Sequence, residues 1–277
     1  MVSLGRIIQR GTVALHITDS GGAGPPVVIL HGLAGSGSEM ESTAAALNDY
    51  RVLTIDARGH GRSTTLPDDV SRAAHTADVV FVIETVVGRP VALVGHSMGG
   101  HTALLVASAR PDLVKRLVLL EAGVGGDGSA ESREALHRFF ESWPLPFATA
   151  EDARGFLGDS PLSRAWIDDL DARPDGLWPR FDPAVMMETL AQIDAHPRWE
   201  EWCTLNVPTL AVFGAAGMFS PAAQQELESR GRVIRRVTLD SGSHDAHLDS
   251  FDSWIRELRA FLASCPSPPG DIELRHG

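Results

Sequence analysis

The chain has 277 residues, a formal net charge of −12 and a globular composition with 43% hydrophobic and 22% charged residues. Nucleic-acid binding needs clustered lysine and arginine side chains that replace counterions on the phosphates, so this acidic chain is not expected to bind nucleic acid. The length fits one large α/β domain with an insertion, or two small domains, and either would bury a core.

Cysteine content and hydropathy bear on the compartment. Cys203 and Cys265 are too few for a disulfide framework and lack metal-ligand spacing, which favours a reducing compartment. The N-terminal residues show no long apolar segment followed by a cleavage site, and no run approaches the roughly 18 apolar residues of a membrane-spanning helix. We therefore expect a soluble, cytoplasmic protein without membrane contact, and the sequence leaves its oligomeric state open.

Short apolar runs alternate with amphipathic segments along most of the chain. The first segment, TVALHITDSG (residues 12–21), alternates apolar and polar residues and predicts an antiparallel edge strand. Six later runs lack this alternation, as is typical of strands buried on both faces. They lie at residues 26–30, 51–55, 91–94, 116–120, 209–213 and 235–239. Helical spacing occurs at residues 39–47, 71–87, 99–109, 221–230 and 251–262. This order predicts an α/β fold with a mainly parallel sheet flanked by helices.

One stretch, residues 125–206, breaks the alternation. It shows helical patterns, frequent prolines and no clear buried strand, and it holds five of the six tryptophans, namely Trp143, Trp166, Trp178, Trp199 and Trp202. We interpret it as a helical cap inserted into a core domain formed by residues 1–124 and 207–263. The proline-rich tail, residues 264–277, is expected to be poorly ordered.

The pentapeptide GHSMG (residues 95–99) follows an apolar strand and precedes a helix. It fits the G-x-S-x-G nucleophile elbow, in which glycines allow a strained turn that exposes the serine oxygen. Glycine and serine are also common in ordinary strand-to-helix turns, so the pentapeptide alone does not distinguish a nucleophile from a turn. In the first interpretation Ser97 is the nucleophile.

Two further segments favour the interpretation of Ser97 as a nucleophile over an ordinary turn. LHGLAGSG (residues 30–37) and DARGHGRS (residues 56–63) each follow a predicted strand. Together with GHSMGG they resemble the α/β-hydrolase superfamily, over about residues 11–262. The resemblance implies an α/β-hydrolase fold with the cap inserted after the family's sixth strand, here residues 116–120. It also implies that the backbone N–H groups of Leu33 and Met98 form an oxyanion hole, and that no metal or organic cofactor takes part.

A serine hydroxyl needs a base that takes its proton. The segment LDSGSHDAHLDSF (residues 239–251) resembles the superfamily's histidine loop, in which His244 matches the catalytic base and His247 shapes the loop. By the same resemblance, His31 and His60 hold loop backbone. The alternative for His244 is a surface-loop histidine without a catalytic role.

The acid departs from the usual family pattern. Most relatives carry an aspartate at the position that Gly217 occupies here, after the strand at 209–213. We predict that Glu121, at the end of the strand at 116–120, replaces it, because some relatives place their acid there and the carboxyl edge of an open α/β sheet is where ligand sites form. A solvated glutamate is the alternative, and Asp240 and Asp245 are weaker candidates for the acid.

A serine nucleophile indicates acyl chemistry. We expect a serine hydrolase that acts on a carboxylic ester or lactone with a hydrophobic or aromatic acyl part, through an acyl-Ser97 intermediate. Aromatic residues of the cap favour a small hydrophobic substrate, although each of them individually could pack the cap onto the core. The alternatives are C–C bond hydrolysis, thioester hydrolysis, or lyase or perhydrolase activity with the same triad, or a degenerate hydrolase that only binds a ligand.

Overall fold

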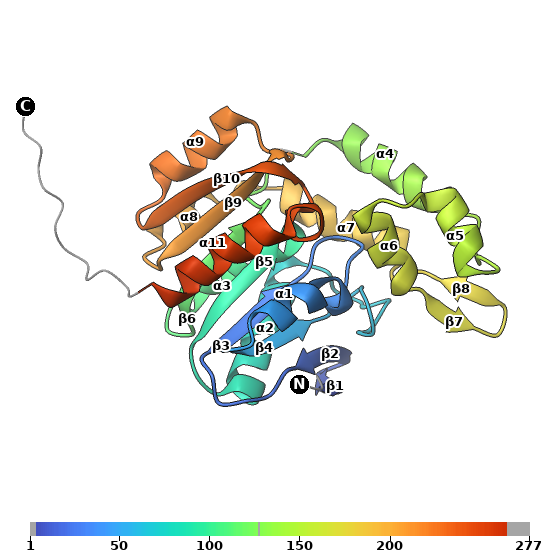
Figure 1. Cartoon of the computed structure of the whole chain (residues 1–277), viewed down its shortest axis with the longest axis horizontal. Helices are drawn as coiled ribbons and strands as arrows, with labels where there is room; N and C mark the ends of the chain where they lie inside the picture. The colour runs from blue at the N-terminus through green and yellow to red at the C-terminus, as the bar shows by residue number, and fades with distance from the viewer. Residues whose placement is uncertain (1–3, 127, 265–277) are drawn as a thin grey trace, which may run out of the picture.

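An eight-stranded sheet forms the centre of the computed structural model, which describes residues 4–126 and 128–264 (Figure 1). The strand order is β1-β2-β4-β3-β5-β6-β9-β10; β2 pairs antiparallel with β1 and β4, and the other neighbours are parallel. The strands are β1 (Leu4–Arg10), β2 (Val13–Asp19), β3 (Pro26–Leu30), β4 (Arg51–Ile55), β5 (Val91–His96), β6 (Val114–Leu120), β9 (Thr209–Ala216) and β10 (Ile234–Ser243). The predicted α/β fold with a mainly parallel sheet is therefore confirmed.

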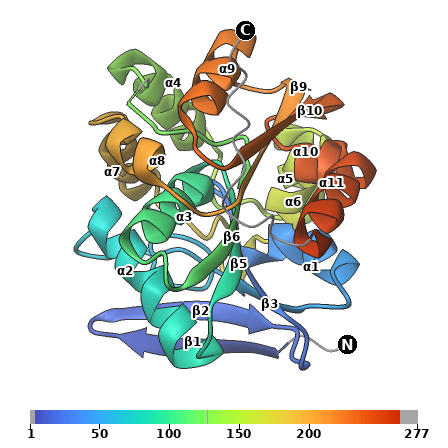
Figure 2. The same cartoon turned by 90° about the vertical axis from the view of Figure 1, so that its left-hand side faces the viewer.

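Helices cover both faces of this sheet (Figure 2). One apolar cluster joins the sheet to α2 (Arg72–Val82), α3 (Met98–Ala109), α8 (Trp199–Thr204) and α9 (Pro221–Arg230). A second cluster, on the other face, joins it to α1 (Glu41–Ala46), α10 (Ala246–Asp249) and α11 (Phe251–Ala263). Every residue of β3 is buried between the two layers, which explains why that strand is continuously apolar.

The structure differs from the sequence prediction at the edge of the sheet and in two helices. The antiparallel strand predicted at residues 12–21 is β2, but β1 lies outside it and forms the edge. Most of β1 is exposed, so its residues carry little apolar pattern and its register comes from pairing with β2. The helix predicted at 39–47 is a 3-10 turn, η1 (Gly37–Met40), followed by α1. The helix predicted at 71–87 is α2 followed by a π turn, η2 (Ile83–Val87), which ends at Gly88 with a φ of 68°.

Most of the segment between β6 and β9 lies to one side of the sheet, at the right of Figure 1, whereas its last helix, α8, lies with the sheet at the left. The segment contains α4 (Ala130–Glu141), α5 (Ala150–Leu157), α6 (Pro161–Asp168), β7 (Asp171–Arg173), β8 (Gly176–Trp178) and α7 (Pro183–Asp194), followed by α8. The hairpin of β7 and β8 is absent from the sequence prediction because three-residue strands are too short to show a period. Most of the segment packs around its own apolar cluster, but Trp202 of α8 is buried in the sheet cluster and its indole N–H donates to the carbonyl of Leu227 at 2.9 Å.

A buried carboxylate joins two loops at the carboxyl edge of the sheet. Asp56, directly after β4, accepts hydrogen bonds from the N–H groups of Gly37 at 2.7 Å and Arg62 at 2.8 Å, and it lies 3.0 Å from Nδ1 of His16. Burial opposes ionisation of this carboxyl, but the hydrogen bonds, led by the one from His16, hold its pKa below the usual value. The loop after β4 and the η1 turn are thereby fixed to each other.

Two sequence-based expectations concern the tail and the membrane. Of the tail at 264–277, residues 265–277 lie outside the described residues. Within the part of the chain that the structure describes, no helix combines the length and apolar character needed to cross a bilayer.

Candidate active site

Ser97 occupies the turn between β5 and α3. Its backbone has φ 50° and ψ −117°, a strained conformation for a residue with a side chain. A Cβ on Gly95 would stand 2.4 Å from the carbonyl oxygen of Gly99, and one on Gly99 would stand 2.5 Å from another backbone oxygen. The flanking positions therefore need glycine because helix, strand and turn backbones approach closely there. This is the strand-turn-helix geometry that the elbow motif predicts.

The two N–H groups expected to form the oxyanion hole belong to neighbouring turns. Met98 is the first residue of α3, so its N–H has no acceptor within the helix. Leu33 follows β3 in a turn that His31 holds: Nε2 of His31 accepts from the N–H of Ala57 at 2.9 Å, and Nδ1 donates to the carbonyl of Gly32 at 2.7 Å. The buried imidazole therefore links the turn that holds Leu33 to the loop after β4, which agrees with the family resemblance, by which His31 holds loop backbone.

The carboxylate of Glu121 lies at the end of β6 and is almost completely buried, at 1% exposure of the residue. Oε1 accepts from the N–H of Gly214 at 2.7 Å, and Oε2 accepts from the N–H of Met218 at 2.8 Å. Oε2 also lies 3.3 Å from Nδ1 of His244, across 123 residues of sequence. An ionised carboxylate accepts only, so the proton of this contact belongs to Nδ1 and Nε2 of His244 is left as an acceptor.

The glycine at position 217 makes room for Glu121. A Cβ on Gly217 would stand 2.0 Å from Oε1 of Glu121, closer than any non-bonded contact allows. An aspartate at that position would therefore occupy the volume that the glutamate carboxylate fills. Glycine at position 217 and glutamate directly after β6 are therefore sterically linked, because the glutamate carboxylate fills the space that an aspartate at position 217 would need.

The other acidic candidates are placed differently. Among the residues the structure describes, Glu121 is the one carboxylate with an oxygen within 4.0 Å of a ring nitrogen of His244. Asp245 lies 3.9 Å from Nε2 of His96, and Asp240 is exposed on β10. Burial raises the pKa of Asp245.

Backbone strain is concentrated at this site. Ala34, Ser97 and Glu121 are the three non-glycine residues with positive φ in residues 4–126 and 128–264, with values of 59°, 50° and 47°. They lie directly after Leu33, at the elbow and at the end of β6. Such conformations cost of order 1–3 kcal/mol each and persist where packing enforces them, typically at functional sites.

His96, the variable position of the elbow, supports the loop that carries His244. Its Nε2–H donates to the carbonyl oxygen of His244 at 2.9 Å, and the two rings have centroids 4.9 Å apart. Burial, followed by the charges of His247 and His244, lowers the pKa of His96 well below the usual value. Sequence reasoning missed this contact, since no spacing rule relates residues 148 positions apart.

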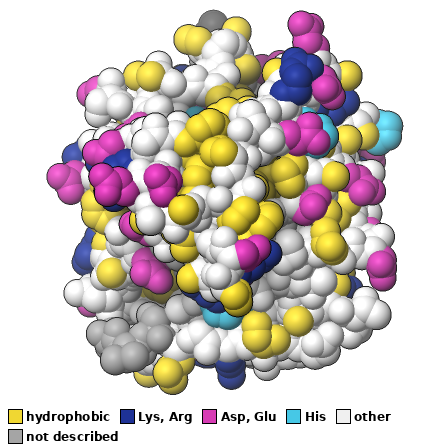
Figure 3. Space-filling model, turned by 90° about the vertical axis from the view of Figure 1, so that its right-hand side faces the viewer, with side chains coloured by type: hydrophobic (Ala, Val, Ile, Leu, Met, Phe, Trp, Pro, Cys, Tyr) yellow, Lys and Arg dark blue, Asp and Glu magenta, His cyan; other side chains and the backbone are white. Residues whose placement is uncertain are grey.

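An aromatic cluster of the inserted segment packs against the turn that holds Leu33 and Ala34. Phe140, Trp143, Phe147 and Phe181 are buried with Ala34, and Leu33 packs against them. Trp199 and Trp202 of α8 instead pack in the sheet core. In Figure 3, which looks onto this side of the molecule, hydrophobic side chains also reach the surface among acidic ones. Phe139 of α4 and Phe156 of α5 are exposed large apolar residues of the segment.

Fold and site together define an α/β-hydrolase. The family described as alpha/beta hydrolase fold matches residues 25–158. The chain is also 43% identical over 265 residues to the sn-1-specific diacylglycerol lipase ABHD11 of Xenopus tropicalis, across 91% of this chain and 82% of the relative. The chain therefore belongs to the α/β-hydrolase family, and the protein is a hydrolase of that type.

Two further comparisons show the range of the family. The chain is 35% identical over 231 residues to a 2-hydroxy-6-oxononadienedioate/2-hydroxy-6-oxononatrienedioate hydrolase of Paraburkholderia xenovorans, across 76% of this chain and 77% of the relative. The crystal structure of E-2-(acetamidomethylene)succinate hydrolase superposes with a TM-score of 0.85 at 20% identity, covering 95% of this chain and 100% of the other. This structural likeness shows the shared fold.

The close approach of the Glu121 carboxylate to Gly217 predicts what a methyl group added at position 217 would do. Gly217→Ala should displace the carboxylate of Glu121, so a crystal structure of the variant should show no oxygen of Glu121 within about 3.5 Å of Nδ1 of His244. The thermal midpoint should also fall, because a buried carboxylate loses hydrogen bonds. Gly155→Ala in α5 is the control, since a Cβ there meets nothing within 4 Å. An intact Glu121–His244 contact in Gly217→Ala would contradict this account.

Proposed function

We propose that the protein is a serine hydrolase that cleaves carboxylic esters, open or cyclic, with Ser97 as nucleophile, His244 as base and Glu121 as the acid of the triad. The observation that carries the proposal is the 3.3 Å contact between Oε2 of Glu121 and Nδ1 of His244. It gives the imidazole the tautomer that accepts a proton at Nε2, and it stabilises the imidazolium that results. The usual aspartate position holds glycine, so without Glu121 this histidine would have no acid partner.

The reaction proceeds in two acyl transfers. Oγ of Ser97 attacks the ester carbonyl carbon while its proton passes to Nε2 of His244, and the carbonyl oxygen becomes an oxyanion facing the N–H groups of Leu33 and Met98. Collapse of this intermediate breaks the bond to the alcohol, which leaves with the proton from His244. Water then gives a proton to His244 and attacks the acyl carbon, the bond from that carbon to Oγ breaks, His244 returns the proton to Oγ of Ser97, and the carboxylic acid is released. Glu121 stays ionised throughout.

The substrate class follows from the inserted segment, which we propose acts as a cap over the site. Its aromatic cluster packs against the turn that holds Leu33, so the acyl chain of a bound ester would lie beside apolar side chains. The relative from Xenopus tropicalis is named as a lipase that acts on diacylglycerol, an ester with long apolar acyl chains. We therefore propose an ester with an apolar acyl part as substrate.

The nucleophile is tested by covalent labelling. A fluorophosphonate probe should modify the peptide that contains Ser97, and Ser97→Ala should abolish both labelling and hydrolysis of 4-nitrophenyl esters, because the serine oxygen forms the covalent bond. Ser229→Ala, on the distant helix α9, should label like the wild type. Labelling detected by mass spectrometry at another residue, or none in folded wild-type protein, would refute the assignment.

The acid is tested by removing its charge. Glu121→Gln should lower kcat by about a thousandfold or more with little change in KM, because an amide cannot stabilise the imidazolium in the transition state. Asp240→Asn changes the exposed alternative carboxylate and should keep wild-type turnover. Steady-state kinetics in which Glu121→Gln stays within about tenfold of wild type would exclude a triad role.

The acyl preference is tested with 4-nitrophenyl esters of increasing chain length, which keep the leaving group constant. Each buried methylene contributes about 0.8 kcal/mol, so kcat/KM should rise by about tenfold or more from acetate to hexanoate. A flat or falling profile would argue against an apolar acyl site beside the inserted segment.

One relative favours a second candidate. The protein from Paraburkholderia xenovorans is named as a hydrolase of a dienedioate with a 6-oxo group, and hydrolysis of such a compound at its ketone would cleave a C–C bond. Product analysis distinguishes the two reactions, because an ester yields an alcohol and an acid, whereas a C–C hydrolase yields two carbon fragments from a ketone without an ester bond.

A further inference from the structure

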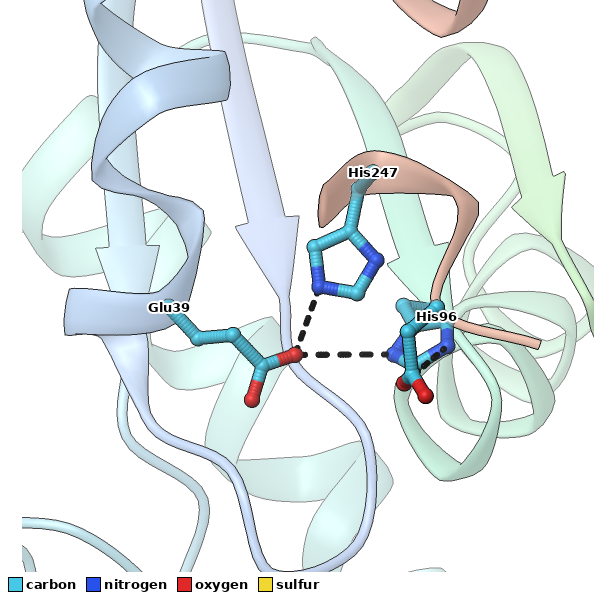
Figure 4. Close-up of side chains that lie close together, drawn as sticks. Glu39, His96 and His247 are labelled. Carbon is cyan, nitrogen blue, oxygen red and sulfur yellow. Dashed lines mark hydrogen bonds and ion pairs between the residues drawn. The ribbon is translucent and has the colours of Figure 1, made fainter. Parts of the chain in front are cut away.

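Four ligand-type side chains from distant parts of the chain converge beside the histidine loop. Glu39 comes from η1, His96 from the end of β5, and Asp245 and His247 from the turn around α10. One ligand atom from each of the four lies within 4.8 Å of the others. Figure 4 shows the side chains of Glu39, His96 and His247 pointing toward one another. We call these four residues the Glu39 cluster.

The two imidazoles approach one carboxylate oxygen. Nε2 of His247 lies 2.6 Å from Oε1 of Glu39, and Nδ1 of His96 lies 3.9 Å from the same oxygen. The residues His96 and His247 are only 3% and 1% exposed. Both nitrogens therefore face Glu39 in a place that bulk water does not reach.

The hydrogen bonds of His96 leave one nitrogen free to act as a ligand. Its Nε2 donates to the carbonyl of His244, and a carbonyl can only accept, so the lone pair of the neutral ring is at Nδ1. This Nδ1 is buried without a hydrogen-bond partner among the described residues. Histidines that ligate a metal commonly donate their other N–H to a backbone carbonyl, which fixes the ring and the tautomer.

Among the described residues, the two carboxylates of the cluster have histidines and no other cationic side chain beside them. Two carboxylates, Glu39 and Asp245, lie together with side-chain exposures of 5% and 18%. Within the described part of the chain, their ion-pair partners are His96 and His247, and neither has an arginine or lysine within 4.0 Å. Buried negative charge is costly unless a cation compensates for it, and a divalent ion would neutralise two carboxylates.

We propose that the Glu39 cluster binds one divalent transition-metal ion of the zinc class. Two imidazoles and one or two carboxylates are the donor set that such ions prefer, whereas Mg²⁺ and Ca²⁺ favour oxygen ligands alone. The ion would join η1, the elbow and the α10 turn. It would thereby fix the loop that carries His244, as a structural ion and not as part of the reaction. The sequence motifs gave no indication of it, because Glu39 and His247 are 208 residues apart.

Zinc binding to the chelator-treated full chain tests this site. Isothermal titration and elemental analysis after dialysis should show one Zn²⁺ per chain with a dissociation constant of about 1 μM or lower. Glu39→Gln and His247→Gln should each weaken binding by about tenfold or more, since each removes a ligand. Zn²⁺ should raise the thermal midpoint of the wild type and not that of Glu39→Gln, because an ion bound only by the native state stabilises it.

Two controls separate the Glu39 cluster from other zinc ligands. Glu121→Gln removes the carboxylate beside His244, and His137→Gln removes a partly exposed His–Glu pair on α4 with nitrogen and oxygen 3.5 Å apart. Both variants should bind Zn²⁺ like the wild type. Zinc binding that Glu121→Gln abolishes and Glu39→Gln does not would overturn the proposal, as would folded wild-type protein, verified by circular dichroism, that retains no zinc. These measurements need no substrate, so their outcome is independent of the esterase assays.

Discussion

The buried carboxylate of Glu121 joins three segments of the chain at the site. A carboxylate at this depth must be fully paired, and it is paired with the N–H groups of Gly214 and Met218 and with Nδ1 of His244. These contacts fix the end of β6, the turn after β9 and the loop after β10 relative to one another. They also forbid a side chain at position 217, where a Cβ would meet the carboxylate at 2.0 Å.

The parallel sheet holds the strained backbone of Ser97 and Glu121 in place. Ser97 and Glu121 end the neighbouring strands β5 and β6, and both hold positive φ values that few packed residues adopt. Hydrogen bonds of the sheet oppose relaxation there: the N–H of Ser97 donates to the carbonyl of Leu120 at 3.0 Å, and that of Glu121 donates to Val212 at 2.9 Å. The strained backbone at Ser97 and Glu121 is thus held by strands that are themselves buried on both faces.

The histidines at the carboxyl edge of the sheet make different contacts. His31 contacts the turn that holds Leu33, His96 donates to the carbonyl of His244, and His247 contacts Glu39. In contrast to these three buried imidazoles, His244 keeps a partly exposed side chain, at 27%. In the proposed mechanism this difference matters, because the base must reach substrate and water while the supporting rings stay fixed.

Strands, helices and the elbow were predictable from local pattern. Continuous apolar runs gave β3 to β6 and β9, because strands covered on both faces need no polar residues, and the glycines around Ser97 marked a turn that only they permit. β1 and the β7–β8 hairpin escaped prediction, since exposed or three-residue strands have no period to read.

The sequence by itself determined the family, the nucleophile candidate and the choice of Glu121 over Asp240 and Asp245. Only the tertiary structure decided that Glu121 reaches His244, that Gly217 must be glycine, and that Glu39, His96 and His247 meet. These contacts join residues up to 208 positions apart. They depend on how parallel strands bring their carboxyl ends to one edge of the sheet.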